Sequence, residues 1–372
     1  MRRTAMAALV YLDHNATAPL RPAAREAALL AMGLAGNASS VHAAGRQARA
    51  LIEDARAQVA GLVGAAPRNV VFTSGGTEAN TLALLGSGRE RLLVSAVEHP
   101  SVLAVRSDAE TIPVNGDGVI DLAALEAMLA QDERPALVSV MAANNETGVI
   151  QPLAEVVRIA HEHCALVHCD AVQAAGRMAL DDLGADFMTL SGHKLGGLQG
   201  AGALVLSPGR DIAAVQRGGG QELGRRAGTE PLAAIVSFGA AAEAAMGDDM
   251  DAIRGLRDDL QAAMLAAVPG ARVMGGDAPR LANTLAIAHP AVEAETLVMA
   301  FDLAGIAVSA GSACSSGKVG PSHVLEAMGQ GALARNTIRI SLGAGTTAAD
   351  TTRCAEAWQA LDSRLGAGRS AA

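Results

Sequence analysis

The chain has 372 residues, enough for two domains that share a well-buried core. Half of the residues are hydrophobic but only 2% are aromatic, so the core must be built from Ala, Val, Leu, Ile and Met. The net charge of −9 argues against a nucleic-acid or anionic-membrane surface. No uncharged apolar run reaches the ~20 residues of a membrane span, and residues 5–10 are too short for a secretory signal. Cytoplasmic residence is the default expectation.

Short apolar runs alternate with helical patterns over the first 210 residues, which indicates an α/β sheet covered on both faces. Long helices are expected at 43–63, 152–163 and 232–242. Strands are expected at 70–72, 91–97, 137–143, 166–170 and 187–190. Beyond about residue 248 the pattern predicts strands at 284–288, 306–309 and 336–342 and an amphipathic helix at 293–303. We therefore predict a large domain, 1–247, and a small C-terminal domain, 248–372.

The strand at 70–72 runs into two glycines and Thr77 at the head of a helix. Glycines let the backbone approach an anion, and the free N–H groups of a first helical turn face it. The segment has neither the dinucleotide pattern G-x-G-x-x-G nor the lysine of a P-loop. An ordinary helix N-terminus explains it equally well.

Three further strands end in polar residues, where open α/β sheets bind ligands. His99 follows one strand, and its imidazole could stack on a flat ring, move a proton or merely cap a helix. Asn145 lies in the polar cluster after the next strand. Asp170 ends a third strand, and a buried carboxylate needs a cationic or N–H partner. Gln173 lies one turn beyond it.

Lys194 follows the apolar run 187–190 and is the residue on which the functional prediction depends. Desolvation lowers the pKa of a lysine, and such an amine can hold an aldehyde cofactor as a Schiff base. A surface lysine after a strand is the alternative. The spacing from Asp170 and Gln173 to Lys194, about one βα unit, matches a pyridoxal phosphate site, in which the carboxylate keeps the pyridine nitrogen protonated.

The four cysteines form no C-x-x-C pair, so a disulfide scaffold is not expected. The neighbourhood of His161, His163, Cys164, His168 and Cys169 could suggest a metal site, but its side chains point to different faces, and we predict packed thiols and no metal. Cys314 lies in a loop of small and polar residues, 310–320, that should be mobile. Lys318 in this loop favours a thiolate at Cys314.

Together these motifs resemble the NifS/IscS-like cysteine desulfurases of the class V aminotransferase family. The motifs stand in the family's order between residues 11 and 343: Tyr11-Leu12-Asp13-x-Asn15-Ala16-Thr17, Gly36-Asn37 with Ser39-Ser40 and His42, Thr73 to Asn80, Glu98-His99-Pro100, Asn144-Asn145-Glu146, His168-x-Asp170-Ala171-x-Gln173, Ser191 to Lys194, Gly218 to Glu222, Arg226-x-Gly228-Thr229, Gly311-Ser312-Ala313-Cys314 and Ile338-Arg339. Two positions depart from the family pattern: Ala38 stands where proline is common, and Leu223 where arginine is frequent.

The resemblance implies a fold-type I pyridoxal phosphate enzyme, with a mostly parallel seven-stranded sheet and a smaller C-terminal α+β domain. It implies that Lys194 binds the cofactor aldehyde, that His99 stacks on its ring and moves protons, and that Cys314 accepts sulfur. The remaining implied cofactor contacts are Gly76, Thr77, Ser191, Gly192 and His193 at the phosphate, Asn145, Asp170 and Gln173 at the ring, and Thr229 from the second subunit of a homodimer. Arg339 and Asn37 are implied to bind the substrate carboxylate.

The implied reaction removes sulfur from L-cysteine, releases L-alanine and leaves a persulfide on Cys314. The persulfide then passes to an acceptor, for which an iron–sulfur scaffold protein is expected. A selenocysteine lyase, a small-amino-acid aminotransferase and a non-catalytic binding module of the same fold are the alternatives. A dinucleotide-dependent oxidoreductase is disfavoured because the fingerprint glycines are missing.

Overall fold

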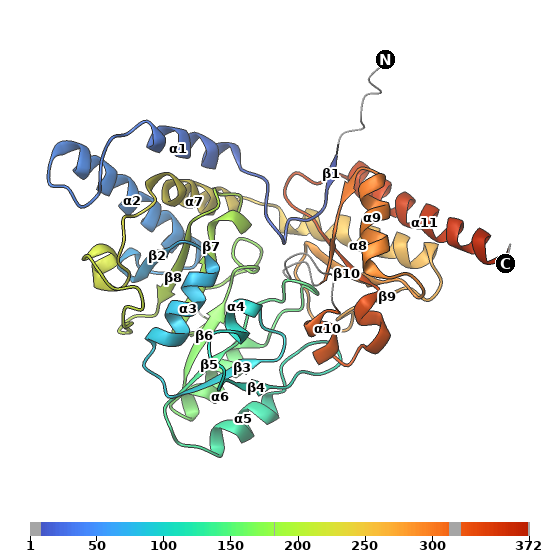
Figure 1. The fold of residues 1–372 in the computed structure, drawn as a ribbon, viewed down its shortest axis with the longest axis horizontal. Helices are drawn as coiled ribbons and strands as arrows, with labels where there is room; N and C mark the ends of the chain where they lie inside the picture. The colour runs from blue at the N-terminus through green and yellow to red at the C-terminus, as the bar shows by residue number, and fades with distance from the viewer. Residues whose placement is uncertain (1–8, 182, 312–320, 371–372) are drawn as a thin grey trace.

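A computed structural model describes residues 9–181, 183–311 and 321–370, with side chains described as far as residue 364. Its larger sheet has seven strands in the order β2-β8-β7-β6-β5-β3-β4, and only β8 runs antiparallel to its neighbours (Figure 1). The strands are β2 (Val70–Thr73), β3 (Arg91–Ser95), β4 (Glu110–Ile112), β5 (Ala136–Ser139), β6 (Leu166–Asp170), β7 (Phe187–Ser191) and β8 (Gly202–Leu206). The mostly parallel seven-stranded sheet predicted from the sequence is confirmed.

Helices cover both faces of this sheet, which explains why its strands are continuous apolar runs. Val70 and Phe72 pack in one hydrophobic cluster and Val71 in another, as the two-residue period of a strand requires. The helices are α1 (Pro22–Met32), α2 (Ala43–Leu62), α3 (Gly76–Gly86), α4 (Pro100–Leu103), α5 (Leu122–Ala130), α6 (Leu153–Glu162) and α7 (Leu232–Ala245). Side chains of α2, α5, α6 and α7 share the first cluster, and α3 packs in the second.

The C-terminal part is built on a smaller, antiparallel sheet in the order β12-β13-β10-β9. Its elements are α8 (Met250–Ala267), β9 (Arg272–Val273), β10 (Thr284–Ala288), α9 (Ala294–Leu303), β11 (Ile306–Ala307), β12 (Ser309–Ala310), α10 (His323–Ala327), β13 (Thr337–Ser341) and α11 (Ala348–Ser370). Trp358 and Phe301 are fully buried in its core. Among the described residues, no helix combines the length and apolarity that a bilayer span needs.

The N-terminal segment belongs to this second core rather than to the first. Strand β1 (Val10–Tyr11) pairs in parallel with β11, and Val10 and Leu12 pack in the same cluster as Trp358. The chain then crosses to α1 on the larger part (Figure 1). We propose that residues 9–13 belong to the small domain. Its predicted boundary at residue 248 stays a prediction. The crossing segment places Asn15 and Ala16 between the two sheets.

Candidate active site

Lys194 lies at the carboxyl end of β7, in the short 3-10 turn Gly192–Lys194. A Cβ built at Gly192 would lie 2.9 Å from Cγ of Phe238 in α7, so this turn needs glycine to pack so closely. The Lys194 Nζ donates hydrogen bonds to the carbonyl oxygens of Asn15, at 2.5 Å, and Ala16, at 2.8 Å. The crossing segment therefore holds the amine in place.

The amine opens into a cavity of about 320 Å³. Most of the residues predicted for the site line this cavity: Gly76, Thr77, His99, Asn145, Asp170, Gln173, Ser191, His193, Lys194 and Arg339. Gly192 does not line it and acts instead through the close packing described above. The cavity thus brings together predicted residues from strand ends and loops that lie far apart in the chain.

Asp170 supplies a buried carboxylate at the end of β6. Its Oδ2 accepts a hydrogen bond from Asn80 Nδ2 at 2.8 Å, and its Oδ1 accepts one from the Val172 N–H at 3.0 Å. Asn80 lies one turn into α3, on the same side of the helix as Thr77. These N–H donors meet the need of a buried carboxylate while keeping its negative charge available to a cationic ligand group.

His99 is held in one orientation by Ser101. Its Nδ1 accepts from the Ser101 N–H at 3.1 Å and lies 2.8 Å from Ser101 Oγ. Ser101 Oγ accepts from Asn80 Nδ2 at 2.9 Å, so its own proton is directed to His99. Burial lowers the pKa of His99, against the opposing effect of Asp170 and together with that of Lys194. Because Nδ1 accepts from the Ser101 N–H, the proton of the neutral ring is assigned to Nε2.

The start of α3 faces the cavity beside the end of β7. A Cβ at Gly76 would lie 3.0 Å from Val172 Cγ2 and 3.6 Å from Ser191 Cβ, so a larger residue would fill this space. The first N–H groups of the helix have no partner within it and attract an anion. His193 Nδ1 lies 3.2 Å from Thr17 Oγ1, and burial and Lys194 lower the pKa of His193 to about 4. His193 can therefore donate a hydrogen bond here as a neutral ring.

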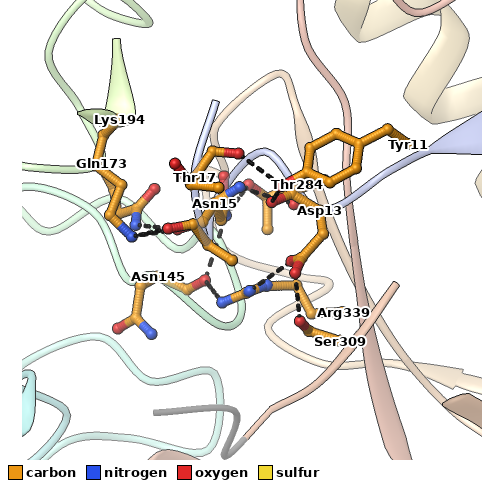
Figure 2. Close-up of polar contacts among 12 residues, drawn as sticks. Tyr11, Asp13, Asn15, Thr17, Asn145, Gln173, Lys194, Thr284, Ser309 and Arg339 are labelled. Atoms are coloured by element: carbon orange, nitrogen blue, oxygen red, sulfur yellow. Dashed lines mark hydrogen bonds and ion pairs between the residues drawn. The ribbon is translucent and has the colours of Figure 1, made fainter. Parts of the chain in front are cut away.

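Arg339, on β13, also lines the cavity and is held by Asp13 of the crossing segment and by Asn145 (Figure 2). Its Nη2 donates to Asp13 Oδ1 at 2.8 Å and its Nη1 to the Asn145 carbonyl at 3.0 Å. Ser309 Oγ in turn donates to Asp13 Oδ2 at 2.7 Å. A guanidinium has five N–H donors, so this anchoring leaves donors for a ligand carboxylate.

Asn15 joins these groups at the centre of Figure 2 and is fully buried. Its carbonyl accepts from Lys194 Nζ and, at 3.0 Å, from Gln173 Nε2. Its side-chain Oδ1 accepts from Arg177 Nη1 at 2.9 Å, and its Nδ2 donates to Thr284 Oγ1 at 2.9 Å. Asn15 thus connects the large sheet to the small one at the cavity.

Sequence reasoning missed several of these positions. The sequence motifs that contain Asn15 and Asn80 predict no role for these two residues, and no sequence pattern points to Ser101 or Arg177. Asn80 could have been found from its spacing. It lies three residues after Thr77, and residues three apart on a helix share a face. Arg177 Nη1 donates to Gln173 Oε1 at 2.6 Å, and burial lowers the pKa of Arg177 to about 10.

Two predicted residues, Asn37 and Thr229, are not brought into the cavity of this chain. Asn37 and Thr229 are exposed and do not line the cavity, so their roles stay predictions. Cys314 lies outside the described residues. Within the described part of the chain no cluster of metal-ligating side chains occurs. Of the thiols expected to be packed, Cys169 is buried, but Cys164 is exposed.

A strand-end lysine and a buried carboxylate in one cavity of a mostly parallel sheet define the class of the protein. The family model described as "Aminotransferase class-V" matches residues 10–353, so the chain belongs to this family, whose members depend on pyridoxal phosphate. A protein of Cereibacter sphaeroides named cysteine desulfurase is 45% identical over 93% of this chain and 94% of the relative.

Solved structures give the same result. The X-ray structure of a NifS-like protein from Rickettsia africae has a TM-score of 0.89 and 37% identity, covering 95% of this chain and 99% of the other. A structure described as "SspA in complex with cysteine" has a TM-score of 0.78 and 29% identity, covering 91% of this chain and 99% of the other. The predicted family and fold are confirmed.

Proposed function

We propose that this protein is a cysteine desulfurase that uses pyridoxal phosphate to move sulfur from L-cysteine to Cys314 and releases L-alanine. The observation that carries the proposal is that the Lys194 amine, the Asp170 carboxylate and the Arg339 guanidinium line one cavity of about 320 Å³. The relative named cysteine desulfurase and the neighbour solved with cysteine support the choice of substrate.

The residues present fit the cofactor. A cavity bounded by an amine, a carboxylate and a helix N-terminus offers one partner for each reactive end of pyridoxal phosphate: the aldehyde, the pyridine nitrogen and the phosphate. Gly76 leaves open the space that a Cβ would fill. Asn80 Oδ1, on a side chain that lines the cavity, is buried without a hydrogen-bond partner in the described part of the chain.

Lys194 would hold the aldehyde, Asp170 the pyridine nitrogen, and Gly76, Thr77, Ser191 and His193 the phosphate. Asn145 and Gln173 would contact the ring, and Thr229 of a second copy of the chain would complete the phosphate site. When bound, the cofactor supplies an electron sink for the bonds at the substrate α-carbon.

The chain's own groups bind the substrate and move its protons. Arg339 binds the substrate carboxylate, and its ion pair with Asp13 fixes the direction of the guanidinium. Lys194 lines the cavity and would be the base that takes the α-proton. His99 presents Nε2–H to the cavity because Ser101 occupies Nδ1. These contacts would fix the carboxylate and the α-carbon of L-cysteine in the cavity.

The Cys314 thiolate attacks the substrate sulfur. A sulfur–sulfur bond forms, the Cβ–S bond breaks, and its electron pair stays on the substrate carbon, which takes up a proton and leaves as alanine. The persulfide then passes to an acceptor thiol, for which we propose an iron–sulfur scaffold protein. A selenocysteine lyase or an aminotransferase would leave no persulfide on Cys314, so the fate of the sulfur separates these alternatives.

The test compares the purified wild type, Lys194→Ala and the exposed control Arg158→Ala after loading with pyridoxal phosphate. We expect a visible absorption band and alanine production from L-cysteine in the wild type and the control. Lys194→Ala should lose both. A wild-type-like band in Lys194→Ala would show that another group holds the cofactor and would overturn the assignment.

A further inference from the structure

Glu146 contacts both ends of the segment that carries Cys314. Its neighbour Asn145 lines the cofactor cavity, but Glu146 itself does not. Ser322 Oγ donates to Glu146 Oε2 at 2.5 Å, and a Cβ built at Gly311 would lie only 2.6 Å from the same oxygen. Gly311 is the last described residue before the Cys314 segment, and Ser322 lies just after it.

Glu146 is itself rigidly placed. It is buried, with 4% of its surface exposed, and its backbone N–H donates to Asn144 Oδ1 at 2.9 Å. The Asn144 side chain also donates to the Val97 carbonyl at 3.0 Å, and Val97 precedes the His99 loop. The backbone of Glu146 is therefore tied to the loop that carries Asn145, while its carboxyl group contacts Gly311 and Ser322, at the two ends of the segment 312–320 that carries Cys314.

A second contact supports the same connection. His323 Nε2 lies 2.9 Å from the carbonyl oxygen of Glu98, the residue before His99. Ser322 Oγ also accepts from the Leu325 N–H at 3.1 Å and so caps α10. The start of α10 is thus fixed to the two loops that carry Asn145 and His99.

We propose that Glu146 is a positioning residue that sets the two ends of the Cys314 segment relative to the cofactor cavity. This inference rests on the proposed role of Cys314. Three peptide links separate Gly311 from Cys314 in the sequence, a reach of at most about 11 Å, so the position of Gly311 limits where the thiol can be. Attack by the thiolate requires close alignment with the substrate sulfur. Displacing either end of the segment that carries Cys314 should make this alignment less frequent.

Substitution of Glu146 should slow sulfur transfer to Cys314 but leave cofactor binding and the first reaction with L-cysteine unchanged. In Glu146→Ala, cofactor occupancy and the absorbance change on adding L-cysteine should equal those of the wild type, because Glu146 does not line the cavity. The single-turnover rate of persulfide formation on Cys314 should fall by about 10-fold to 100-fold. Glu146→Gln, which keeps the size and an acceptor oxygen, should restore most of the rate. The exposed control Glu155→Ala should match the wild type.

Two measurements keep the test decisive if Glu146→Ala is poorly folded. Ser322→Ala should slow persulfide formation, and Gly311→Ala should do so through its contact with Glu146, with a loss that is not additive to that of Glu146→Ala. Amide exchange at Leu325 and Met328 should quicken in Ser322→Ala and Glu146→Ala, with or without cofactor.

The outcomes are distinct. Absence of persulfide in the wild type would refute the proposed function itself. Persulfide formation in the wild type, together with wild-type rates and wild-type exchange at α10 in Ser322→Ala and Glu146→Ala, would refute the positioning role. A parallel loss of cofactor in the variants would also refute it, since Glu146 would then act on the cavity.

Discussion

Asn80 donates a hydrogen bond of 2.8 Å to Asp170, and the same amide nitrogen lies 2.9 Å from Ser101 Oγ. Ser101 in turn holds His99 Nδ1. The Asn80 amide on α3 therefore fixes the position of the Asp170 carboxylate and, through Ser101, that of the imidazole of His99. The carboxylate and the imidazole follow different strands of the sheet. This connection makes Asn80 a residue on which both sides of the cofactor ring should depend.

We expect Asn80→Ala to weaken cofactor binding. The variant removes a hydrogen bond to a charged acceptor, worth about 1.5–3 kcal/mol, or about 10-fold to 100-fold in the dissociation constant. Titration of the apoprotein with pyridoxal phosphate, followed by absorbance, measures the effect. Thr81→Ala, the next residue on α3, is the control. Equal affinity in Asn80→Ala and the wild type would contradict the role given to this bond.

Arg339→Lys should impair substrate binding more than cofactor binding. A lysine keeps the charge but not the planar fork that contacts Asp13 and a substrate carboxylate together. We expect kcat/KM for L-cysteine to fall by about 10-fold to 100-fold, mainly through KM, from the loss of a charge-assisted hydrogen bond. Arg335→Lys, at an exposed position nearby, should behave as the wild type. An unchanged KM in Arg339→Lys would rule out Arg339 as the carboxylate ligand.

Much of this site could be predicted because strand ends converge by topology. Asp170 and Lys194 each follow an apolar run, and parallel strands bring their carboxyl ends to one edge of the sheet. The crossing segment could not be predicted in this way. β1 pairs with β11, almost the whole chain away, and no local pattern shows that the Asn15 carbonyl meets Lys194.

The strand boundaries show a smaller difference. The expected strand at 137–143 ends at Ser139 in the structure, although the Val140 and Ala142 N–H groups still donate to the His168 and Asp170 carbonyls. The apolar pattern continues because residues 140–143 are buried and their backbone goes on bonding to the neighbouring strand for a few residues. Glu146 shows why motif spacing alone misses some roles: its partners, Gly311 and Ser322, belong to the other half of the chain.

Glu222→Ala should destabilise the fold. Glu222 Oε1 and Oε2 accept from Arg56 Nη2 and Nη1 at 2.8 and 2.6 Å, and Oε2 also accepts from the N–H of Phe72 on the edge strand β2. These contacts hold Glu222 at a φ of 48°, a left-handed conformation that side chains rarely adopt.

Removing one partner of a buried pair leaves an uncompensated charge and costs about 3–5 kcal/mol of unfolding free energy. Urea unfolding of the unliganded protein measures this cost. Glu53→Ala removes the half-exposed partner of the same arginine and should cost at most about 1 kcal/mol. Equal free energies of unfolding for Glu222→Ala and Glu53→Ala would contradict the stabilising role given to the buried pair of Arg56 and Glu222.

The pH dependence of stability should distinguish Glu146→Gln from the wild type. Burial raises the pKa of Glu146 from 4.5 to about 7, against opposing effects of Ser322 and Arg339. A raised carboxyl pKa means that the folded state holds the proton more tightly than the unfolded state. This contribution is therefore present at low pH and is lost as the pH rises from 4.5 through about 7.

Glutamine does not titrate, so the variant lacks this loss. The stability of Glu146→Gln relative to the wild type should rise between pH 5 and pH 8, by up to about 3 kcal/mol. Thermal unfolding of both proteins at the two pH values measures the difference. If the stability of Glu146→Gln relative to the wild type is constant or falls with pH, the pKa of Glu146 is not raised in the folded protein.

A single turnover most directly tests whether sulfur moves from L-cysteine to Cys314. The cofactor-loaded enzyme is mixed with one equivalent of L-cysteine, stopped with acid, and measured by peptide mass and by released alanine. We predict one added sulfur on the Cys314 peptide for each alanine formed, and neither in Cys314→Ala. Alanine formation at the wild-type rate in Cys314→Ala, or added sulfur on another cysteine, would contradict the account.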